Sequence, residues 1–322
     1  MKGYNPSEPY TINRREPASE HNRESLKDVS RIKTMKLIMI IALLLTSGQL
    51  MGVEATRILS EAGDQQLQQA LEQLVRDQGL AGAVEEKQLS LALVIVTDPA
   101  NPHLAELNGH DMAYAASLPK IAILLAAAVE IDDGRLELDG RLYRDLTDMI
   151  RYSCNACATR VLDQVGRQEL LDILQAPEYK FYDHEQNGGL WVGKAYGPES
   201  AYKRDPMAGL SHGATAFQAA RFYYKLHTGT LVSPEQSTMM LDVLSRPGIS
   251  HKFVKGLESY EGLEIYRKSG TWKTFHADSA LVRFKGNAYI MVALAHSPDG
   301  AAWLEQLAAP LHELAISGLV NR

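Results

Sequence analysis

The sequence predicts an α/β protein of the α+β kind. An antiparallel five-stranded sheet is flanked by N- and C-terminal helices and carries an inserted all-helical subdomain. Three observations predict this fold: an amphipathic helix with two strand-like runs, a long helical stretch, and three further strand-like runs with a final helix. Because the strand-like runs lie at the two ends of this order, we expect both chain ends to close one sheet.

The first sheet segment is expected soon after residue 60. "DQQLQQALEQLVRDQG" (64–79) has apolar residues at helical spacing and ends in glycine, which predicts a helix. "LSLALVIVTD" (89–98) and "HLAELNG" (103–109) are typical of strands and are separated by a turn at Asn101-Pro102. We expect the two strands to pair as a hairpin.

The second sheet segment is expected near the C-terminus. The strand-like runs "LEIYRKSGTW", "HADSALVRFK" and "AYIMVALAHS" precede an amphipathic helix, "GAAWLEQLAAPLHELAISGLV", which could cover a sheet. From about Met112 to Leu244 the pattern is mostly helical. One domain (56–322) is therefore expected to have a sheet part (56–114 and 255–322) and a helical part (115–254), with a site in the cleft between them.

The first 55 residues are expected to lie outside this domain. Residues 1–34 are polar and without apolar periodicity, as in a disordered leader or an extension upstream of the true start. In 35–55 and just before it, basic residues precede a short apolar run (37–45) that leads to Val53-Glu54-Ala55, the pattern of a signal peptide. We expect a secreted or periplasmic protein, anchored in the membrane if the signal is not cleaved.

Composition argues against several kinds of partner. The net charge is −6, and no stripe of Lys and Arg crosses the body of the chain, so nucleic acid is not expected to be a partner. The ten histidines are scattered and none forms H-E-x-x-H. We expect no metal, no cofactor and no obligate protein partner.

A candidate nucleophile opens the stretch "SLPKIAILLAAAVE". Its apolar character predicts a buried helix, and Pro119 fits only the first turn of such a helix. Ser117 is then expected at the helix start, with Lys120 on the same side. A buried Lys can lose enough basicity to take the proton of a serine hydroxyl, and helix N-terminal amides can stabilise an oxyanion.

Two further motifs follow in order along the chain. "YSCNAC" gives Ser153 and Asn155 as S-x-N between two helical runs, and "YRKSGTW" gives Lys268-Ser269-Gly270 late in a strand. S-x-x-K alone is uninformative, because it also occurs at Ser30 and Ser200. The three motifs in this order, each on a suitable element, resemble those of class A β-lactamases and penicillin-binding D,D-peptidases.

The resemblance covers roughly residues 60–320 and implies a role for each matching residue. It makes Ser117 the acylated nucleophile, Lys120 its base and Ser153 the hydroxyl that protonates the leaving nitrogen. Asn155 is expected to hold a substrate carbonyl, and Lys268 with Ser269 and Gly270 the substrate carboxylate. The backbone N–H groups of Ser117 and Thr271 are expected to form the oxyanion hole. The implied substrates are β-lactams or peptidoglycan stem peptides ending in D-Ala-D-Ala.

Two departures from the class A pattern weaken the β-lactamase interpretation. The E-x-x-L-N context of the deacylating glutamate is missing, although Glu178, Glu185 and Glu199 lie in the corresponding region. The interval from Ser117 to Ser153 is also short, which suggests a more open cleft. A D,D-carboxypeptidase or endopeptidase, and a penicillin-binding sensor that does not turn over, therefore remain alternatives to a β-lactamase.

Two features of the sequence have other interpretations. "GLSHG" (209–213) matches a nucleophile elbow, so a serine esterase using Ser211 is a remote alternative. Since no strand is expected before it, Ser211 is better explained as a helix cap.

Cys154 and Cys157 lack the context of a redox or zinc motif and are expected to be either two small buried thiols or, in an oxidising compartment, a disulfide.

Overall fold

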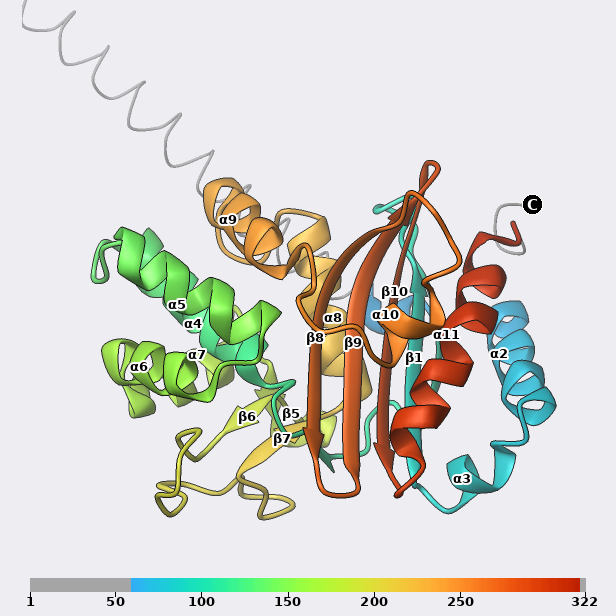
Figure 1. The fold of residues 1–322 in the computed structure, drawn as a ribbon, viewed down its shortest axis with the longest axis horizontal. Helices are drawn as coiled ribbons and strands as arrows, with labels where there is room; N and C mark the ends of the chain where they lie inside the picture. The colour runs from blue at the N-terminus through green and yellow to red at the C-terminus, as the bar shows by residue number, and fades with distance from the viewer. Residues whose placement is uncertain (1–58, 319–322) are drawn as a thin grey trace, which may run out of the picture. The chain divides into compact units, whose positions relative to one another are not determined.

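The computed structural model describes residues 59–318, so the expected leader (1–34) and signal peptide (35–55) lie outside the described residues. The predicted fold class is confirmed by a five-stranded antiparallel sheet of order β2-β1-β10-β9-β8 (Figure 1). Its strands are β1 (Leu89–Ile95), β2 (His103–Leu107), β8 (Glu264–Trp272), β9 (Phe275–Phe284) and β10 (Asn287–His296). The hairpin of β1 and β2 and the late position of Lys268-Ser269-Gly270 in a strand are as expected. Both ends of the described chain contribute strands, and β8 is an edge strand.

Alternation of side chains along β1 explains why both faces of the sheet are covered. Leu91 and Leu93 belong to one apolar core, whereas Ala92 and Val94 belong to another. Successive side chains of a strand point to opposite faces, so a strand that is apolar throughout needs a layer on each side.

Helices supply the two covering layers. On one face, α2 (Gln65–Asp77), α10 (Phe253–Gly256) and α11 (Gly300–Ile316) pack in the same core as Leu91, next to the short α3 (Ala81–Glu85). On the other face, α8 (Ala216–His227) contacts β1, β9 and β10. Asp64 caps α2 by accepting from the amides of Gln66 and Leu67, which fixes its start where the sequence predicts it.

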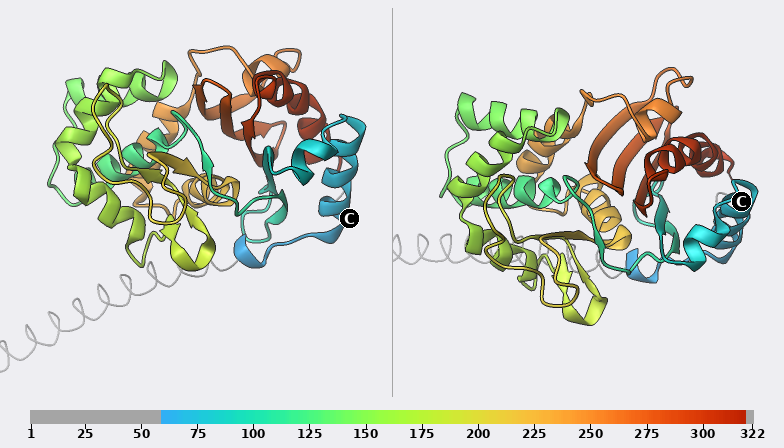
Figure 2. Two further views of the ribbon diagram at one scale, coloured as in Figure 1. Left: turned by 90° about the horizontal axis from the view of Figure 1, so that it is seen from below. Right: turned by 60° about the horizontal axis from the view of Figure 1, so that its bottom comes forward.

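The helical segment lies beside the β8 edge of the sheet. Figure 2 shows this segment next to the strands in both views, and it comprises α4 (Lys120–Asp132), α5 (Gly140–Arg151), α6 (Asn155–Val165), α7 (Arg167–Gln175) and α9 (Pro234–Leu244). Helix α4 is buried on every side from Lys120 to Glu130, as its all-round apolar sequence predicts. This burial makes α4 a rigid base for the residues just before it.

Short strands interrupt the stretch that the sequence predicts as mostly helical. One small sheet has the order β3-β7-β6, and a second pairs β4 with β5. These elements are β3 (Ala113–Tyr114), β4 (Tyr182–Asp183), the 3-10 turn η1 (His184–Gln186), β5 (Gly188–Gly189), β6 (Trp191–Val192) and β7 (His212–Ala214). Strands of two or three residues are too short to show a period in the sequence, so they were not predicted.

The expected capping role of Ser211 is wrong. Helix α8 is capped by Thr215, whose hydroxyl accepts the amide of Gln218. Ser211 lies farther upstream, and β7 intervenes between it and the helix.

Within residues 59–318, no helix is both long and apolar enough to cross a bilayer.

Candidate functional site

The turn that carries Ser117 joins β3 to α4. The α-helix begins at Lys120, so Ser117 lies in the turn before it rather than in the helix itself. Two backbone hydrogen bonds between residues three apart close this turn. The Leu118 amide donates to the Ala115 carbonyl at 3.0 Å, and the Lys120 amide donates to the Ser117 carbonyl at 3.3 Å. Ala116 has a φ of 52°, a strained backbone for a residue with a side chain. This conformation of Ala116 turns the chain sharply just before Ser117. The Ser117 side chain is half-buried.

Lys120 lies in the interior with its ammonium bonded to the loop between α5 and α6. Its Nζ donates to the Ser153 carbonyl at 2.7 Å, to Asn155 Oδ1 at 2.8 Å and to Ser153 Oγ at 3.4 Å. Burial lowers the pKa of Lys120 to about 7, because the charged form loses its hydration. Among the described residues, no hydrogen bond joins this ammonium to the Ser117 hydroxyl. At neutral pH Lys120 is therefore half neutral and able to accept a proton.

An aromatic ring covers the Lys120 ammonium. Nζ lies 4.4 Å from the centre of the Tyr196 ring, and the Tyr196 hydroxyl donates to the Ala116 carbonyl at 3.3 Å. The ring also packs against His212, with centroids 4.3 Å apart. Tyr196 therefore holds the turn before Ser117 and shields the lysine from one side.

The loop between α5 and α6 brings Ser153 between two lysines. Ser153 has a φ of 58°, and its Oγ accepts from Lys268 Nζ at 3.1 Å in addition to the longer bond from Lys120. Asn155 is the first residue of α6 and exposes its side chain. A disulfide joins Cys154 to Cys157, with Cα atoms 5.3 Å apart, so the two cysteines are not free thiols. This bridge encloses Asn155 and adjoins Ser153.

The end of β8 contributes the second buried cation. Lys268 Nζ donates to the Ser269 carbonyl at 2.6 Å as well as to Ser153, and complete burial lowers the pKa of Lys268 well below its usual value. The Ser269 hydroxyl is 3.1 Å from His251 Nε2. Burial, with the neighbouring Arg267 and Lys252 cations, lowers the pKa of His251 to about 4, so this ring is neutral at pH 7. A substrate anion would find the Lys268 amine here, and among the described residues no carboxylate is bonded to it.

Gly270 allows β8 to touch the turn that carries Ser117. A Cβ at this position would lie 2.2 Å from the Ala115 carbonyl oxygen and 2.7 Å from the Ser117 nitrogen. Any side chain would therefore push the strand away from Ser117. The close approach places the Gly270–Thr271 peptide and the Ser117 amide side by side, as two donors to one oxyanion require.

The structure thus gathers the residues that the three motifs predict. The turn before α4, the α5–α6 loop and the end of β8 converge, and they carry Ser117, Lys120, Ser153, Asn155, Lys268, Ser269, Gly270 and Thr271. Three neighbours were not assigned a role from the sequence: Tyr196, His251 and Lys252. They lie in irregular segments where no motif marks them, and only their contacts identify them.

Among the described residues, no hydrogen bond or ion pair joins the three glutamates of the region after α7 to Lys120, Ser153 or Lys268. Glu178, Glu185 and Glu199 are all exposed. Instead, a buried carboxylate organises the loop: Asp205 accepts from the amides of Met207 and Ala208 and from the Tyr182 hydroxyl. Among the described residues, no carboxylate forms an ion pair with Lys120.

Ser211 has a histidine neighbour but not the setting of a nucleophile elbow. Its Oγ is 3.3 Å from Nδ1 of His212, while Nε2 of that ring is 3.0 Å from the Lys194 carbonyl. Burial lowers the pKa of His212 to about 4, which makes it a poor base. No strand immediately precedes Ser211, and β7 rather than a helix follows it.

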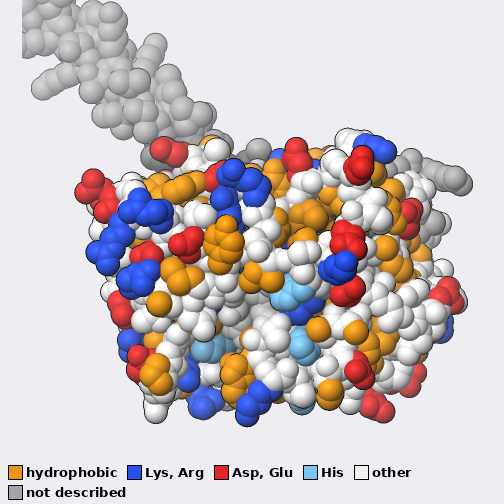
Figure 3. Space-filling model, viewed as in Figure 1, with side chains coloured by type: hydrophobic (Ala, Val, Ile, Leu, Met, Phe, Trp, Pro, Cys, Tyr) orange, Lys and Arg blue, Asp and Glu red, His pale blue; other side chains and the backbone are white. Residues whose placement is uncertain are grey.

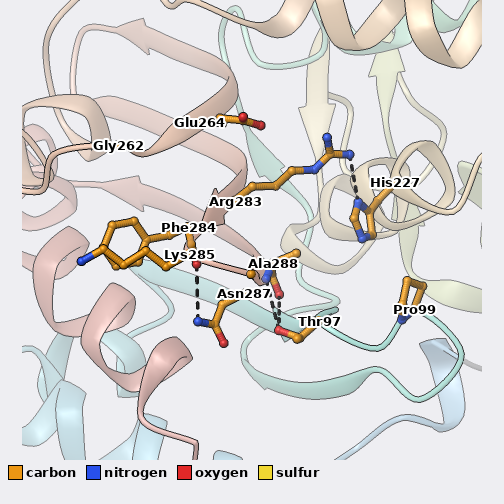
Figure 4. A pocket seen from close by; sticks show the side chains of 11 residues that line it. Thr97, Pro99, His227, Gly262, Glu264, Arg283, Phe284, Lys285, Asn287 and Ala288 are labelled. Carbon is orange, nitrogen blue, oxygen red and sulfur yellow. Dashed lines mark hydrogen bonds between the residues drawn. The ribbon is translucent and has the colours of Figure 1, made fainter.

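A separate pocket of about 460 Å³ lies at the opposite end of the sheet (Figure 4). It is lined by Glu264, the first residue of β8, and by Arg283, which donates to His227 Nδ1 at 3.3 Å. Lys268 lies four positions after Glu264 along the extended strand, about 13 Å away at ~3.3 Å per residue. This pocket is therefore not part of the cluster around Ser117.

Surface charge does not single out another site on the face seen in Figure 3. Basic and acidic side chains are interspersed there, and histidines are visible near the middle of this face. The fold and this cluster together define a serine hydrolase of the β-lactamase and penicillin-binding-protein type.

The chain belongs to the β-lactamase enzyme family, whose pattern it matches over residues 141–315. A comparison with curated protein sequences gave no significant match. The solved structures it is similar to include PBP-A, at 19% identity and a TM-score of 0.59, covering 79% of this chain and 97% of that one. The β-lactamase from Sphaerobacter thermophilus is 16% identical, with a TM-score of 0.59 over 76% of this chain and 98% of that one. A variant of the last common ancestor of Gram-negative bacterial class A β-lactamases is 18% identical, with a TM-score of 0.60 over 78% and 98%. At these identities the likeness is one of fold.

Proposed function

We propose that this protein forms a covalent acyl-serine intermediate on Ser117 with substrates that carry a carboxylate near a cleavable amide. β-Lactams and peptidoglycan stems ending in D-Ala-D-Ala have this chemistry. The observation that supports the proposal best is the single hydrogen-bonded cluster of Lys120, Ser153, Asn155 and Lys268 beside the turn of Ser117. A PBP-A mutant similar in fold, at 20% identity, was captured as an acyl-enzyme with penicillin G, which favours β-lactams as probes.

Acylation begins with the Ser117 hydroxyl. Its oxygen attacks the amide carbonyl carbon while its proton passes to the neutral amine of Lys120, a form that is available because burial lowers the pKa of Lys120 to about 7. The carbonyl oxygen becomes an oxyanion between the Ser117 and Thr271 amides, which Gly270 allows to come close together.

Collapse of the intermediate breaks the carbon–nitrogen bond. Ser153 gives its hydroxyl proton to the leaving nitrogen and regains a proton from a neighbouring lysine, since its Oγ lies 3.1 Å from Lys268 Nζ and 3.4 Å from Lys120 Nζ. The substrate carboxylate binds beside Lys268 and the Ser269 hydroxyl, and Asn155 holds the carbonyl of the acyl side chain. Each of these roles belongs to the proposal.

Release of the acyl group is expected to be slow for β-lactams. Water attack on the ester needs a base, whereas Glu178, Glu185 and Glu199 are exposed and the Tyr196 ring covers Lys120. This favours a D,D-peptidase, or a penicillin-binding sensor without turnover, over an efficient β-lactamase. An exported protein, as the N-terminal sequence indicates, would meet such substrates in the cell wall.

The test is labelling of the mature protein with a fluorescent penicillin, followed by mass spectrometry of the modified peptide over time. We expect one adduct on Ser117 that persists for many minutes, with no adduct in Ser117→Ala. A wild-type protein that takes no label would refute the proposed function. Rapid loss of the label with release of hydrolysed drug would refute slow release and establish a β-lactamase. Ser211→Ala is the matched control, and esterase activity that survives in Ser117→Ala and disappears in Ser211→Ala would identify the elbow serine instead.

A further inference from the structure

A third lysine, Lys252, is buried behind the strand that borders the nucleophile. The residue is 1% exposed, and its ammonium donates to three oxygens: the Gly270 carbonyl at 2.6 Å, the Thr271 hydroxyl at 2.8 Å and the Ala277 carbonyl at 3.1 Å. A buried cation is normally paired with a carboxylate, but all three of these acceptors are neutral, and the nearby Asp278, whose charge favours the protonated form of Lys252, is bonded to Arg267 instead. An arrangement this costly needs a reason.

The backbone of Lys252 is held in place for this contact. Its φ of 52° is unfavourable for a residue with a side chain. On either side, Arg267 donates to the His251 carbonyl at 3.2 Å, and the Phe253 amide donates to Asp278 Oδ2 at 3.2 Å. The buried Arg267–Asp278 pair thus fastens the chain around Lys252 to β8 and β9.

The shortest of these three hydrogen bonds, at 2.6 Å, is the one to the Gly270 carbonyl, which belongs to the Gly270–Thr271 peptide. The same peptide bears the N–H of Thr271, which the proposed mechanism places in the oxyanion hole. In a planar trans peptide the C=O and the N–H point in opposite directions. An ammonium that fixes the Gly270 carbonyl on the inner side therefore fixes the Thr271 N–H on the outer side.

Gly270 brings this peptide next to the turn that carries Ser117. A Cβ on this residue would lie 2.7 Å from the Ser117 nitrogen, so the strand touches the nucleophile turn at this point. The ammonium also polarises the peptide to which it is bonded, and a polarised amide is a stronger donor. Burial lowers the pKa of Lys252 only to about 8, so it remains mostly charged at pH 7.

We propose that Lys252 is a positioning residue for the acylation reaction: through the Gly270 carbonyl it orients and polarises the Thr271 amide that receives the oxyanion. Lys252 does not touch substrate. The inference depends on the proposed function, because it assigns a purpose to the peptide that borders Ser117.

The role predicts a particular kinetic signature. The oxyanion exists only after attack, so the loss of Lys252 should slow the acylation step without weakening the first, noncovalent binding of substrate. Displacement of a catalytic group by about 1 Å can cost on the order of 100-fold in rate. A lysine that only stabilised the fold would not change these two constants in this selective way.

The experiment measures acylation of the mature protein by a fluorescent penicillin over a range of drug concentrations. This separates the limiting acylation rate from the dissociation constant of the noncovalent complex. The variant is Lys252→Met, and the matched control is Lys225→Met. Lys225 is likewise buried, with its pKa lowered to about 8 and a bond to the Glu178 carbonyl at 3.1 Å, but on α8.

We expect Lys252→Met to lower the limiting rate roughly 30- to 100-fold while the dissociation constant stays within about 3-fold. Lys225→Met should keep the wild-type rate. The proposal is overturned if the two variants acylate at rates within about 3-fold of each other, or if Lys252→Met changes only the dissociation constant. Should Lys252→Met fail to fold by circular dichroism, Lys252→Leu, which likewise lacks an N–H donor, is judged by the same criteria. A wild-type protein that takes no label refutes the proposed function, whereas a labelled wild type with an equally reactive Lys252→Met refutes only the role of Lys252.

Discussion

The Lys120 ammonium lies 4.4 Å from the centre of the Tyr196 ring, inside the same cluster that bonds it to Ser153 and Asn155. Two effects on the pKa of Lys120 oppose each other here. Burial disfavours the charged form, whereas the ring face attracts the cation. Burial is the larger effect, and the pKa of Lys120 falls to about 7.

The pH dependence of acylation follows from this value. In the proposed mechanism the neutral amine of Lys120 is the base, so the rate should rise with pH and reach half its plateau near pH 7. The measurement is the second-order labelling rate with penicillin between pH 5.5 and pH 8.5, about one and a half units on each side of that pKa. A rate that is constant through pH 7, or that falls as pH rises, would exclude Lys120 as the base.

Removal of the Tyr196 ring should shift that profile. Tyr196→Ala admits water to the ammonium, which restores its hydration and raises the pKa of Lys120, so we expect the midpoint to rise by about one unit or more. Water next to the ester should also shorten the lifetime of the acyl-enzyme. The matched control is Tyr196→Phe, which keeps the ring and loses only the bond to the Ala116 carbonyl. An unchanged midpoint in Tyr196→Ala would show that the ring does not set the basicity of Lys120.

The sequence predicted the sheet and the motif residues for clear physical reasons. The strand β10 and the helix after Ser117 have long apolar patterns, and these patterns are read directly from residue order. The contacts that tune the cluster depend on tertiary packing instead. Tyr196 reaches Lys120 from an irregular loop, and Lys252 reaches Gly270 from a strained residue before a short helix, so neither has a local signature.

The state of the two cysteines is another feature that the sequence alone could not determine. Their spacing allowed either a bridge or two thiols, because a disulfide requires side chains that face each other, and residue order does not specify this. The start of α4 is a smaller example: Pro119 is expected in the first turn, yet it is the N-cap, the helix proper begins at Lys120, and Ser117 lies in a tight turn.

The low pKa values of the buried lysines should make the free energy of unfolding depend on pH in an unusual way. Lys225 and Lys252 have pKa values lowered to about 8, whereas in an unfolded chain lysine titrates near ~10.4. Between these values the unfolded chain binds more protons, so the free energy of unfolding rises with pH, by about 1.4 kcal/mol per unit for each proton. Above about pH 10 the direction reverses, because Tyr179 and Tyr202, with pKa values raised to about 12, keep protons that the unfolded chain loses.

We therefore expect urea unfolding to give a free energy about 2 kcal/mol or more higher at pH 9.5 than at pH 7.5. In Lys225→Met the free energy of unfolding should rise less steeply with pH over this interval, by the amount that corresponds to about one proton. Maximal stability at or below pH 7 would contradict the low basicity of these lysines.

The buried pair of Arg267 and Asp278 should be sensitive to the loss of one partner. Arg267 Nε and Nη2 each donate to Asp278 at 2.7 Å, and the side chains are 3% and 0% exposed. Asp278→Asn leaves the guanidinium without its counter-charge, which typically costs about 3–5 kcal/mol. The exposed pair of Arg167 and Asp163 is the comparison, and Asp163→Asn should cost less than about 1 kcal/mol in the same denaturant titration. Equal losses in the two variants would show that burial of the Arg267 pair has no special weight.

The disulfide between Cys154 and Cys157 should support the loop that presents Ser153 and Asn155. A bridge that closes so short a loop restricts the unfolded chain by an amount worth about 2 kcal/mol. In Cys154→Ser/Cys157→Ser the new hydroxyl at position 154 can still accept the amide of residue 157, as the Cys154 sulfur does at 3.1 Å, so the start of α6 is kept and only the bridge is lost. We expect the free energy of unfolding to fall by about that amount and the limiting acylation rate to fall several-fold, because the Asn155 side chain gains freedom that binding must then remove.

Thiol titration of the unreduced, denatured protein checks the bridge itself. It should find no free thiol before reduction and two after it, since Cys154 and Cys157 are the only cysteines of the chain. Ala156→Ser is the matched control, because it changes an exposed residue between the two cysteines without touching the bridge. Two reactive thiols in the unreduced protein would contradict the disulfide. Acylation at the wild-type rate in the double serine variant would show that packing alone holds Ser153 and Asn155 in place.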